Sequence, residues 1–285
     1  MTSPRTVYLN GAFLPFAEAH VSIMDRGFLF ADGIYEVSAV LDGKLVDNAA
    51  HLARLDRSLG EIGIRNPHTL AEWEGLETEL VARNALDEGL VYMQVTRGVY
   101  ERDFGFPPAD VPPTVVMFTQ GKKVAGNPLA ETGAKVVTVE DIRWKRRDIK
   151  SVALLAQVLA KQEAVKAGVA EAWMVEDGAV TEGSSSTAFI VTKERVLVTR
   201  PLSTALLPGI TRAAVLRLAT EADLRVEERL FSVEEARGAA EAFYTSASAF
   251  VMPVVAIDGA VIGEGRPGPL ARRLRELYID MARAG

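Results

Sequence analysis

Four of the five Asn-Gly or Asp-Gly pairs in this chain, each flanked by apolar residues, constrain its fold more than any other feature of its sequence. The pairs are Asn10-Gly11, Asp42-Gly43, Asp177-Gly178 and Asp258-Gly259. Both positions of such a pair accept a positive φ angle, which a two-residue hairpin turn requires. The pattern predicts tight hairpins, and therefore antiparallel strands, in both halves of the chain.

Segments with helical spacing of apolar residues alternate with the strand segments. Apolar positions three or four residues apart predict helices over residues 48–63, 70–86, 151–168, 210–222 and 269–284. Shorter apolar runs predict further strands, among them 91–98, 114–120, 135–142, 171–176 and 186–192. Because hairpins outnumber long helical crossovers, we expect an α+β fold of two α/β domains with mostly antiparallel strands.

The best candidate for a domain boundary is the segment 121–133, which is rich in Gly, Pro and charge and has no sustained periodicity. We therefore expect an N-terminal α+β domain over residues 1–120, an interdomain linker over 121–133 and a C-terminal domain over 134–285. With 48% apolar residues, a chain of 285 residues can bury a core in each domain.

Composition removes several classes of chemistry. The chain contains no cysteine, which excludes disulfides, thiol nucleophiles, iron–sulfur clusters and cysteine zinc sites. His20, His51 and His68 are scattered and match no metal-binding motif, so we expect structural or surface roles and no metal site. The chemistry must therefore rest on Lys, Arg, Tyr, Ser, Thr or carboxylates.

Charge and hydropathy constrain the partners. The net charge of −6 leaves no overall basic footprint for nucleic acid or an anionic membrane. No run of about 18 uninterrupted apolar residues occurs, and the first residues do not match a targeting segment. We expect a cytoplasmic protein whose partners are small molecules and a second copy of itself.

Residues 263–268 spell G-x-G-x-x-G after a strand and before a helix, as in dinucleotide-binding proteins. Only 17 residues follow (285 minus 268), so no second parallel strand can complete a βαβ unit. We expect a turn at this point, which leaves a nicotinamide oxidoreductase as the least favoured function.

The densest basic run, residues 143–150, ends at Lys150 where an apolar helix is predicted to begin. The run alone fits a solvated face or a nucleic-acid patch, and the acidic chain argues against the latter. The position of Lys150 can desolvate its amine, as a Schiff-base lysine requires. Position alone still favours a structural role for this lysine.

Three further features support a cofactor site. Glu182 precedes a run of serines, and a carboxylate can hold the protonated nitrogen of a pyridine ring that acts as an electron sink. Residues 207–211 lead into a helix, whose N-terminal amides favour an anion such as phosphate. Arg54 can add a bidentate contact to the same anion.

Ordered motifs extend this pattern over nearly the whole chain. They are DRGF at 25–28, DGIYE at 32–36, HLARL at 51–55, QVTRG at 94–98, DIKS at 148–151, TEGSSS at 181–186 and PGITR at 208–212. Together they resemble the fold type IV pyridoxal-phosphate aminotransferases, and most of all the D-amino-acid aminotransferases. The resemblance implies that the cofactor, pyridoxal 5'-phosphate, lies at the domain interface.

The resemblance also implies roles for single residues. Lys150 would form the Schiff base with the cofactor and move the substrate proton, and Glu182 would hold the pyridine nitrogen. The other residues expected to contact the cofactor are Arg54 and the amides of Ile210 and Thr211 at the phosphate, Leu207 at the ring face, and Ser186 and Ser248 as hydroxyl donors.

The substrate carboxylate would be bound by Tyr35 and by Arg102, the latter on a loop contributed by the partner subunit of a homodimer with a shared active site. Two residues depart from the family pattern. Phe104 stands where a histidine accompanies the loop arginine, which makes the pocket more apolar. Ala247 stands where the family offers a threonine to the phosphate.

We therefore expect a ping-pong transamination between a D-amino acid, such as D-alanine, and a 2-oxo acid, such as 2-oxoglutarate. The alternatives on the same scaffold are a branched-chain aminotransferase, an (R)-selective amine transaminase and an aminodeoxychorismate lyase. A non-catalytic binding protein is the alternative from a different class.

Overall fold

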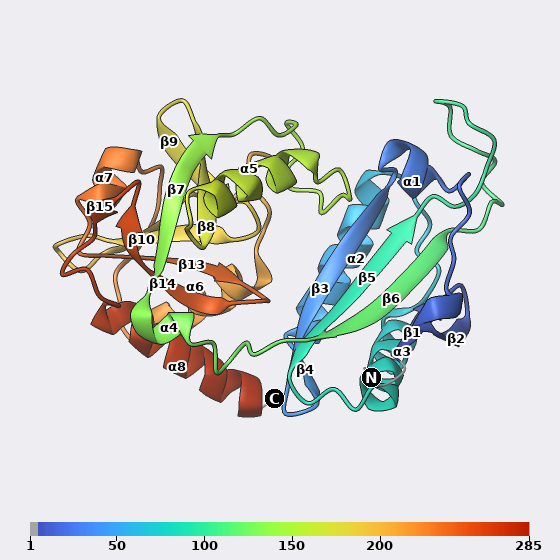
Figure 1. Cartoon of the computed structure of the whole chain (residues 1–285), viewed down its shortest axis with the longest axis horizontal. Coiled ribbons are helices and arrows are strands. Elements are labelled where there is room, and N and C mark those ends of the chain that lie inside the picture. Colours follow the sequence, from blue (N-terminus) through green and yellow to red (C-terminus); the bar gives the residue numbers. More distant parts are fainter. Residues whose placement is uncertain (1–4, 285) are drawn as a thin grey trace. The chain divides into compact units, whose positions relative to one another are not determined.

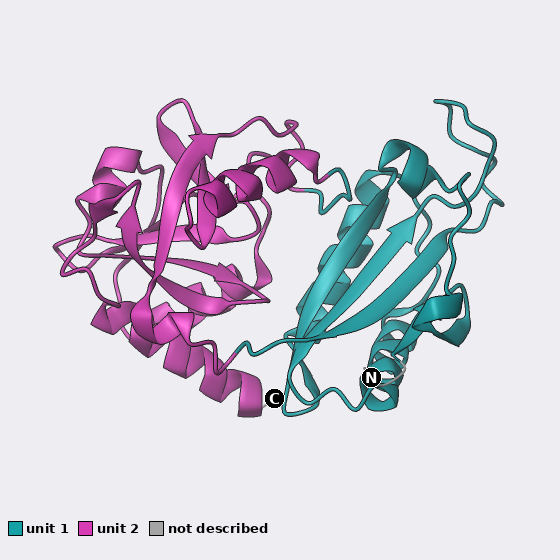
Figure 2. Cartoon of the chain, in the orientation of Figure 1, with its two compact units in different colours: residues 1–124, 149–153 teal, residues 125–148, 154–285 magenta. Residues whose placement is uncertain are grey.

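The computed structural model describes residues 5–284 (Figure 1) and divides the chain into two compact units (Figure 2). Unit 1 comprises residues 1–124 and 149–153, and unit 2 comprises 125–148 and 154–285. The division at residues 124 and 125 falls within the segment predicted as a linker. Residues 1–4 and 285, which the predicted domain limits include, lie outside the described residues.

One short segment differs from the predicted division. Residues 149–153 lie with unit 1, although the prediction placed them in the C-terminal domain. The N–H of Tyr35 donates to the carbonyl of Lys150 at 2.9 Å, and the N–H of Val152 donates to the carbonyl of Gly33 at 3.0 Å. These backbone bonds extend the sheet of unit 1, and no local pattern in the sequence indicates such a distant pairing.

Unit 1 is built on an antiparallel sheet with the strand order β2-β1-β6-β5-β3-β4. The strands are β1 (Thr6–Leu9), β2 (Ala12–Pro15), β3 (Gly33–Leu41), β4 (Lys44–Val46), β5 (Gly89–Thr96) and β6 (Thr114–Gly121). Helices α2 (Asn48–Glu61) and α3 (Leu70–Arg83) pack on this sheet around Leu55, Trp73 and Leu80, and η1 (Phe16–Glu18) and α1 (Arg26–Phe30) precede β3.

Unit 2 contains a mixed sheet with the order β12-β11-β10-β13-β14-β7-β8-β9, and β15 pairs with β14. The strands are β7 (Ala134–Glu140), β8 (Glu171–Glu176), β9 (Ala179–Gly183), β10 (Thr187–Val191), β11 (Leu197–Thr199), β12 (Val226–Glu228), β13 (Glu241–Ser246), β14 (Phe250–Ile257) and β15 (Ala260–Val261). The pairs β7–β8, β14–β7 and β11–β12 are parallel, whereas the other pairs are antiparallel.

The helices of unit 2 are α4 (Leu129–Thr132), α5 (Leu155–Lys166), α6 (Ile210–Glu221), α7 (Val233–Arg237) and α8 (Pro269–Ala284). Helix α5 connects the parallel strands β7 and β8, and it begins at Leu155, four residues later than predicted. On the sheet, Ala188 and Ala242 belong to one core cluster, whereas Phe189 and Phe243 stack on each other with ring centroids 4.8 Å apart. This alternation places Thr187 and its register partner Thr245 on the same side as Phe189.

All four predicted hairpins are confirmed. The Asn-Gly or Asp-Gly pairs join β1 to β2, β3 to β4, β8 to β9 and β14 to β15, and both residues of each pair have positive φ angles. The predicted α+β class with mostly antiparallel strands is confirmed as well. Residues 263–268 form a turn before α8, with positive φ at Gly263 and Gly265. None of the helices formed by residues 5–284 combines the length and apolar content needed to span a bilayer.

Candidate active site

Lys150 lies against Tyr35 in unit 1. Its half-buried side chain places Nζ 4.2 Å from the centroid of the Tyr35 ring, and its backbone N–H lies 3.5 Å from Oγ of Ser58. The Tyr35 ring in turn stacks on Tyr92 at a centroid distance of 5.6 Å. The structure thus brings together the predicted amine and one of the two residues predicted for the substrate carboxylate.

A buried carboxylate on β3 holds the predicted phosphate ligand Arg54. Glu36 accepts from Nε of Arg54 at 2.7 Å and from Nη2 at 2.8 Å, and Nδ1 of His51 lies 2.8 Å from the same carboxylate. Burial opposes ionisation of Glu36, but Arg54 and His51 together hold its pKa well below the usual range. Burial lowers the pKa of His51 despite Glu36, so its neutral ring donates from Nδ1.

Sequence reasoning gave Glu36 no role. The available signal was a charged residue at an inward-facing position of an otherwise apolar strand, which requires a buried partner. The partner could not be named, because Arg54 is 18 positions away on α2.

In unit 2, Glu182 on β9 is buried and makes an ion pair with Arg143. The backbone N–H of Leu207 lies 3.3 Å from both carboxylate oxygens of Glu182. Burial raises the pKa of Glu182, and the positive charge of Arg143 opposes that rise. Glu182 and Leu207, both predicted to contact the cofactor ring, therefore lie together, and Arg143 was not predicted.

The start of α6 is a ready site for an anion. Gly209 is the N-cap residue and supplies no side-chain cap, so the N–H groups of Ile210 and Thr211 have no partner within the helix. A Cβ at Gly209 would lie 2.8 Å from Oγ1 of Thr187, whose strand partner Thr245 has a buried hydroxyl without a hydrogen-bond partner among the described residues. Uncapped amides and an unsatisfied hydroxyl fit a phosphate group.

The two predicted serine contacts already bond within the protein. Oγ of Ser186 donates to the buried carboxylate of Glu171 at 3.1 Å, together with Ser184. Oγ of Ser248 lies 3.3 Å from Oγ of Ser246. A role for Ser186 and Ser248 at the cofactor therefore stays a prediction, and Glu171 was missed because its partners lie more than ten positions away.

Arg102 lies on an exposed loop of unit 1 among aromatic rings. Its guanidinium carbon is 5.3 Å from the Phe30 centroid and 5.7 Å from that of Phe104, and these two rings are 5.5 Å apart. Phe104 is 79% exposed. Within residues 5–284 Arg102 pairs with no carboxylate, so its guanidinium is available to an anionic substrate.

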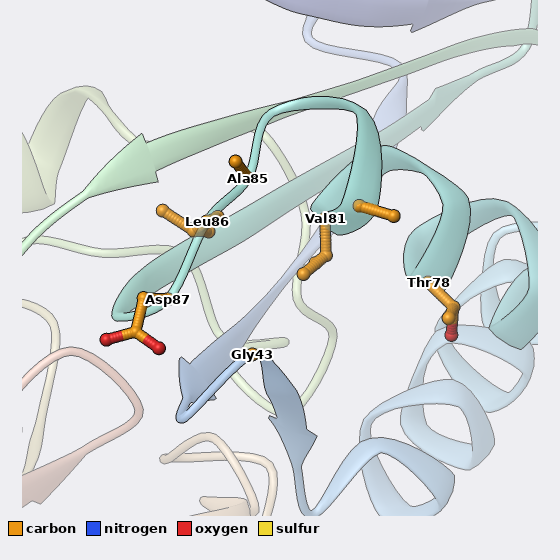
Figure 3. A pocket seen from close by; sticks show the side chains of 7 residues that line it. Gly43, Thr78, Val81, Ala85, Leu86 and Asp87 are labelled. Carbon is orange, nitrogen blue, oxygen red and sulfur yellow. The ribbon is translucent and has the colours of Figure 1, made fainter.

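Unit 1 also contains a pocket of about 300 Å³ (Figure 3). It is lined by Gly43, Thr78, Val81, Ala82, Ala85, Leu86 and Asp87. None of the candidate residues lines it. The described residues also contain no cluster of three or more histidines and carboxylates that could bind a metal ion.

Unit 1 thus presents an amine beside a tyrosine, and unit 2 presents a buried carboxylate and an uncapped helix N-terminus, which are the kinds of group that pyridoxal phosphate requires. The chain matches the family model of amino-transferase class IV over residues 33–257 and therefore belongs to the class IV aminotransferases. Membership confirms the predicted fold type IV family, the enzyme class and the cofactor, pyridoxal 5'-phosphate.

Individual relatives agree with this family. The chain is 42% identical to a D-alanine aminotransferase of Staphylococcus aureus over 95% of both chains, and 40% identical to that of Bacillus licheniformis over 94% of both. Among solved structures it is similar to the branched-chain aminotransferase of the thermophilic archaeon Thermoproteus uzoniensis with norvaline, with a TM-score of 0.86 and 26% identity over 98% of this chain and 95% of the other.

Proposed function

We propose that this class IV aminotransferase transfers an amino group between a D-amino acid, such as D-alanine, and a 2-oxo acid, such as 2-oxoglutarate. The observation that carries the choice of substrate is the 42% identity to a D-alanine aminotransferase over 95% of both chains. The second candidate is transamination of L-leucine, because the chain is also similar in structure to a branched-chain aminotransferase. The sequence identity to that protein is lower, at 26%.

Pyridoxal phosphate, when bound, supplies an aldehyde carbon and an electron-accepting ring. Lys150 offers the amine for the covalent bond to the cofactor, and its Nζ takes and returns the α-proton of the substrate. Glu182 supplies the negative charge that holds a proton on the ring nitrogen, and Leu207 packs against the ring.

The remaining residues bind anions. Arg54 and the amides of Ile210 and Thr211 bind the phosphate, and the carboxylate of Glu36 keeps the Arg54 guanidinium in one orientation. Tyr35 and Arg102 bind the substrate carboxylate, since Arg102 has a guanidinium free of carboxylate partners in the described chain.

Arg102 reaches the active site of a second subunit in this proposal, so the active enzyme is a homodimer. The aromatic residues around Arg102 support this, because Phe104 leaves most of its surface exposed in a single chain. We place the reaction in the cytoplasm, where free amino acids and 2-oxo acids are available, and cell fractionation tests that location.

Substrate-induced spectra of the purified protein test the proposal. The protein should be yellow, and borohydride reduction should attach the cofactor to Lys150, as peptide mass spectrometry would show. D-alanine should bleach the visible band and L-leucine should leave it, whereas the reverse preference would favour the branched-chain activity. A colourless protein that ignores added pyridoxal phosphate would exclude both.

A further inference from the structure

We propose that Arg143 is a positioning residue that holds Glu182 as an oriented carboxylate anion. The importance of Arg143 rests on the proposed function, in which Glu182 faces the ring nitrogen of the cofactor. Arg143 itself touches neither substrate nor cofactor in this proposal, and it acts through Glu182.

The guanidinium of Arg143 is bound on two sides by carboxylates. Its Nε and Nη2 donate to the two oxygens of Asp141 at 2.9 and 2.7 Å, and its Nη1 donates to Oε1 of Glu182. The Arg143 side chain is only 5% exposed, and that of Asp141 is fully buried. The two hydrogen bonds to Asp141 fix the plane of the Arg143 guanidinium. The orientation of this plane determines the position of Nη1, which donates to Glu182.

Neighbouring groups hold Asp141 in turn. Oγ1 of Thr181 donates to Oδ2 of Asp141 at 2.6 Å, and Thr181 precedes Glu182 on β9. Nη1 of Arg147 lies 3.3 Å from the same oxygen and 2.9 Å from Glu176. Asp141 therefore interacts with two arginines. Because Arg147 also compensates the charge of Asp141, the positive charge of Arg143 can stabilise the anion of Glu182.

Arg143 is the only ion-pair partner of Glu182 among the residues that the structure describes. A buried carboxylate without a cation nearby takes up a proton, because burial costs less free energy for the neutral acid than for the anion. A protonated Glu182 would carry no charge to hold a proton on the ring nitrogen. The electron-accepting power of the cofactor would then fall, although its phosphate contacts would remain.

The basic run 143–150 thereby divides into two kinds of residue. Arg143 and Arg147 point inward and neutralise buried carboxylates, whereas Lys145 is 84% exposed and pairs with Glu176 at 2.7 Å. Lys145 is thus the matched control, since it lies two positions from Arg143 and also pairs with a carboxylate.

The decisive variants are Arg143→Gln, which removes the charge, Arg143→Lys, which keeps it without the fork, and Lys145→Gln. An adjacent guanidinium shifts the ionisation of a carboxyl by about one to three powers of ten. We expect Arg143→Gln to lower kcat about tenfold to a thousandfold while KM for D-alanine changes less than about twofold. Arg143→Lys should fall between Arg143→Gln and the native enzyme, and Lys145→Gln should match the native enzyme.

Nitrogen NMR of a cofactor labelled at its ring nitrogen gives a readout independent of turnover. The nitrogen should be protonated in the native holoenzyme and in Lys145→Gln, and largely unprotonated in Arg143→Gln. If Arg143→Gln binds pyridoxal phosphate and keeps a protonated nitrogen, Arg143 is merely structural and the proposed function stands. If the native protein binds no pyridoxal phosphate, the proposed function itself fails.

The pairing with Glu182 can be tested without the cofactor. In the full-length protein, Arg143→Gln should lower the free energy of unfolding, and adding Glu182→Gln should restore part of it by removing the unpaired acid. If adding Glu182→Gln lowers the free energy of unfolding further, Arg143 stabilises only Asp141 and the inference is wrong. If Arg143→Gln alone folds poorly, the double variant with Glu182→Gln still tests the pairing, because the inference predicts that it is more stable than the single variant.

Discussion

At the scale of single residues, the buried carboxylates of this protein differ in the partners that hold them. Glu36 and Glu182 each face an arginine. Glu77 on α3 is buried, but it accepts a hydrogen bond from a neutral partner, Nδ2 of Asn48, at 2.8 Å. Burial raises the pKa of Glu77 to about 7. Glu77 is therefore a pH-sensitive element of unit 1 outside the site.

Replacing Glu77 should change how stability depends on pH. Because its folded pKa lies above the unfolded value, Glu77 binds more protons in the folded state, so its contribution is complete at low pH and is lost as pH rises through about 7. Glu77→Gln should raise the free energy of unfolding at pH 8 by about 2 kcal/mol. Urea unfolding at pH 5 and pH 8 measures the difference.

Glu79→Gln is the matched control, because Glu79 is an exposed residue of the same helix that pairs with Arg83 at its surface. It should change stability by less than about 0.5 kcal/mol at either pH. Equal pH dependence of Glu77→Gln and the native protein would show that Glu77 is ionised in the fold.

Sequence reasoning reached the residues that carry the chemistry more readily than those that support them. Lys150 and Glu182 stand in motifs that resemble a family, and each has a chemical role that its residue type suggests. Arg143 looked like part of a basic run, since its partner Glu182 is 39 positions away. Supporting residues depend on long-range contacts, which no local spacing encodes.

At the scale of elements, the strongest predictions were those decided by local backbone geometry. Each of the four pairs predicted as turns adopts positive φ at both residues and joins two paired strands, whereas the fifth pair, Asp32-Gly33, leads into β3 without a hairpin. Helix α5 was predicted to begin four residues too early, because Ser151 and Val152 pair with β3 instead. Tertiary pairing thus overrode the helical pattern at this one end.

The start of α6 provides a prediction about an element. In Gly209→Ala, the new methyl group would lie 2.8 Å from Oγ1 of Thr187 and would displace the first turn of the helix. We expect the Kd for pyridoxal phosphate to rise about tenfold, because the amides of Ile210 and Thr211 would move with that turn. Fluorescence titration of the apoprotein with the cofactor measures it.

Gly60→Ala is the control for that change. Gly60 lies within α2, and a Cβ there would meet nothing within 4 Å. Alanine should stabilise this helix by roughly 0.5–1 kcal/mol and leave cofactor binding unaltered. Native cofactor affinity in Gly209→Ala would argue against phosphate binding at α6.

At the scale of the whole molecule, the proposed exchange of Arg102 between subunits predicts complementation. Lys150→Ala and Arg102→Ala should each be nearly inactive as homodimers. After subunit exchange, a mixed dimer would contain one site with both Lys150 and a partner arginine, so activity should return. Turnover of D-alanine before and after mild unfolding and refolding of the mixture measures this return.

If Arg102 acted within its own chain, neither site of the mixed dimer would be complete, and mixing would restore nothing. A mixture of Lys150→Ala with itself, treated in the same way, controls for changes caused by refolding. Light scattering of each sample shows whether the dimers form at all.

The return of residues 149–153 to unit 1 has a consequence for the newly made chain. Unit 1 is not complete when residue 124 has been synthesised, because the last segment that belongs to it ends 29 residues later (153 minus 124). At roughly 5–20 residues per second, synthesis of that stretch lasts about 1.5 to 6 seconds. During this interval the backbone of β3 near Tyr35 lacks its partner, so the nascent chain exposes a strand edge just where the lysine will later dock.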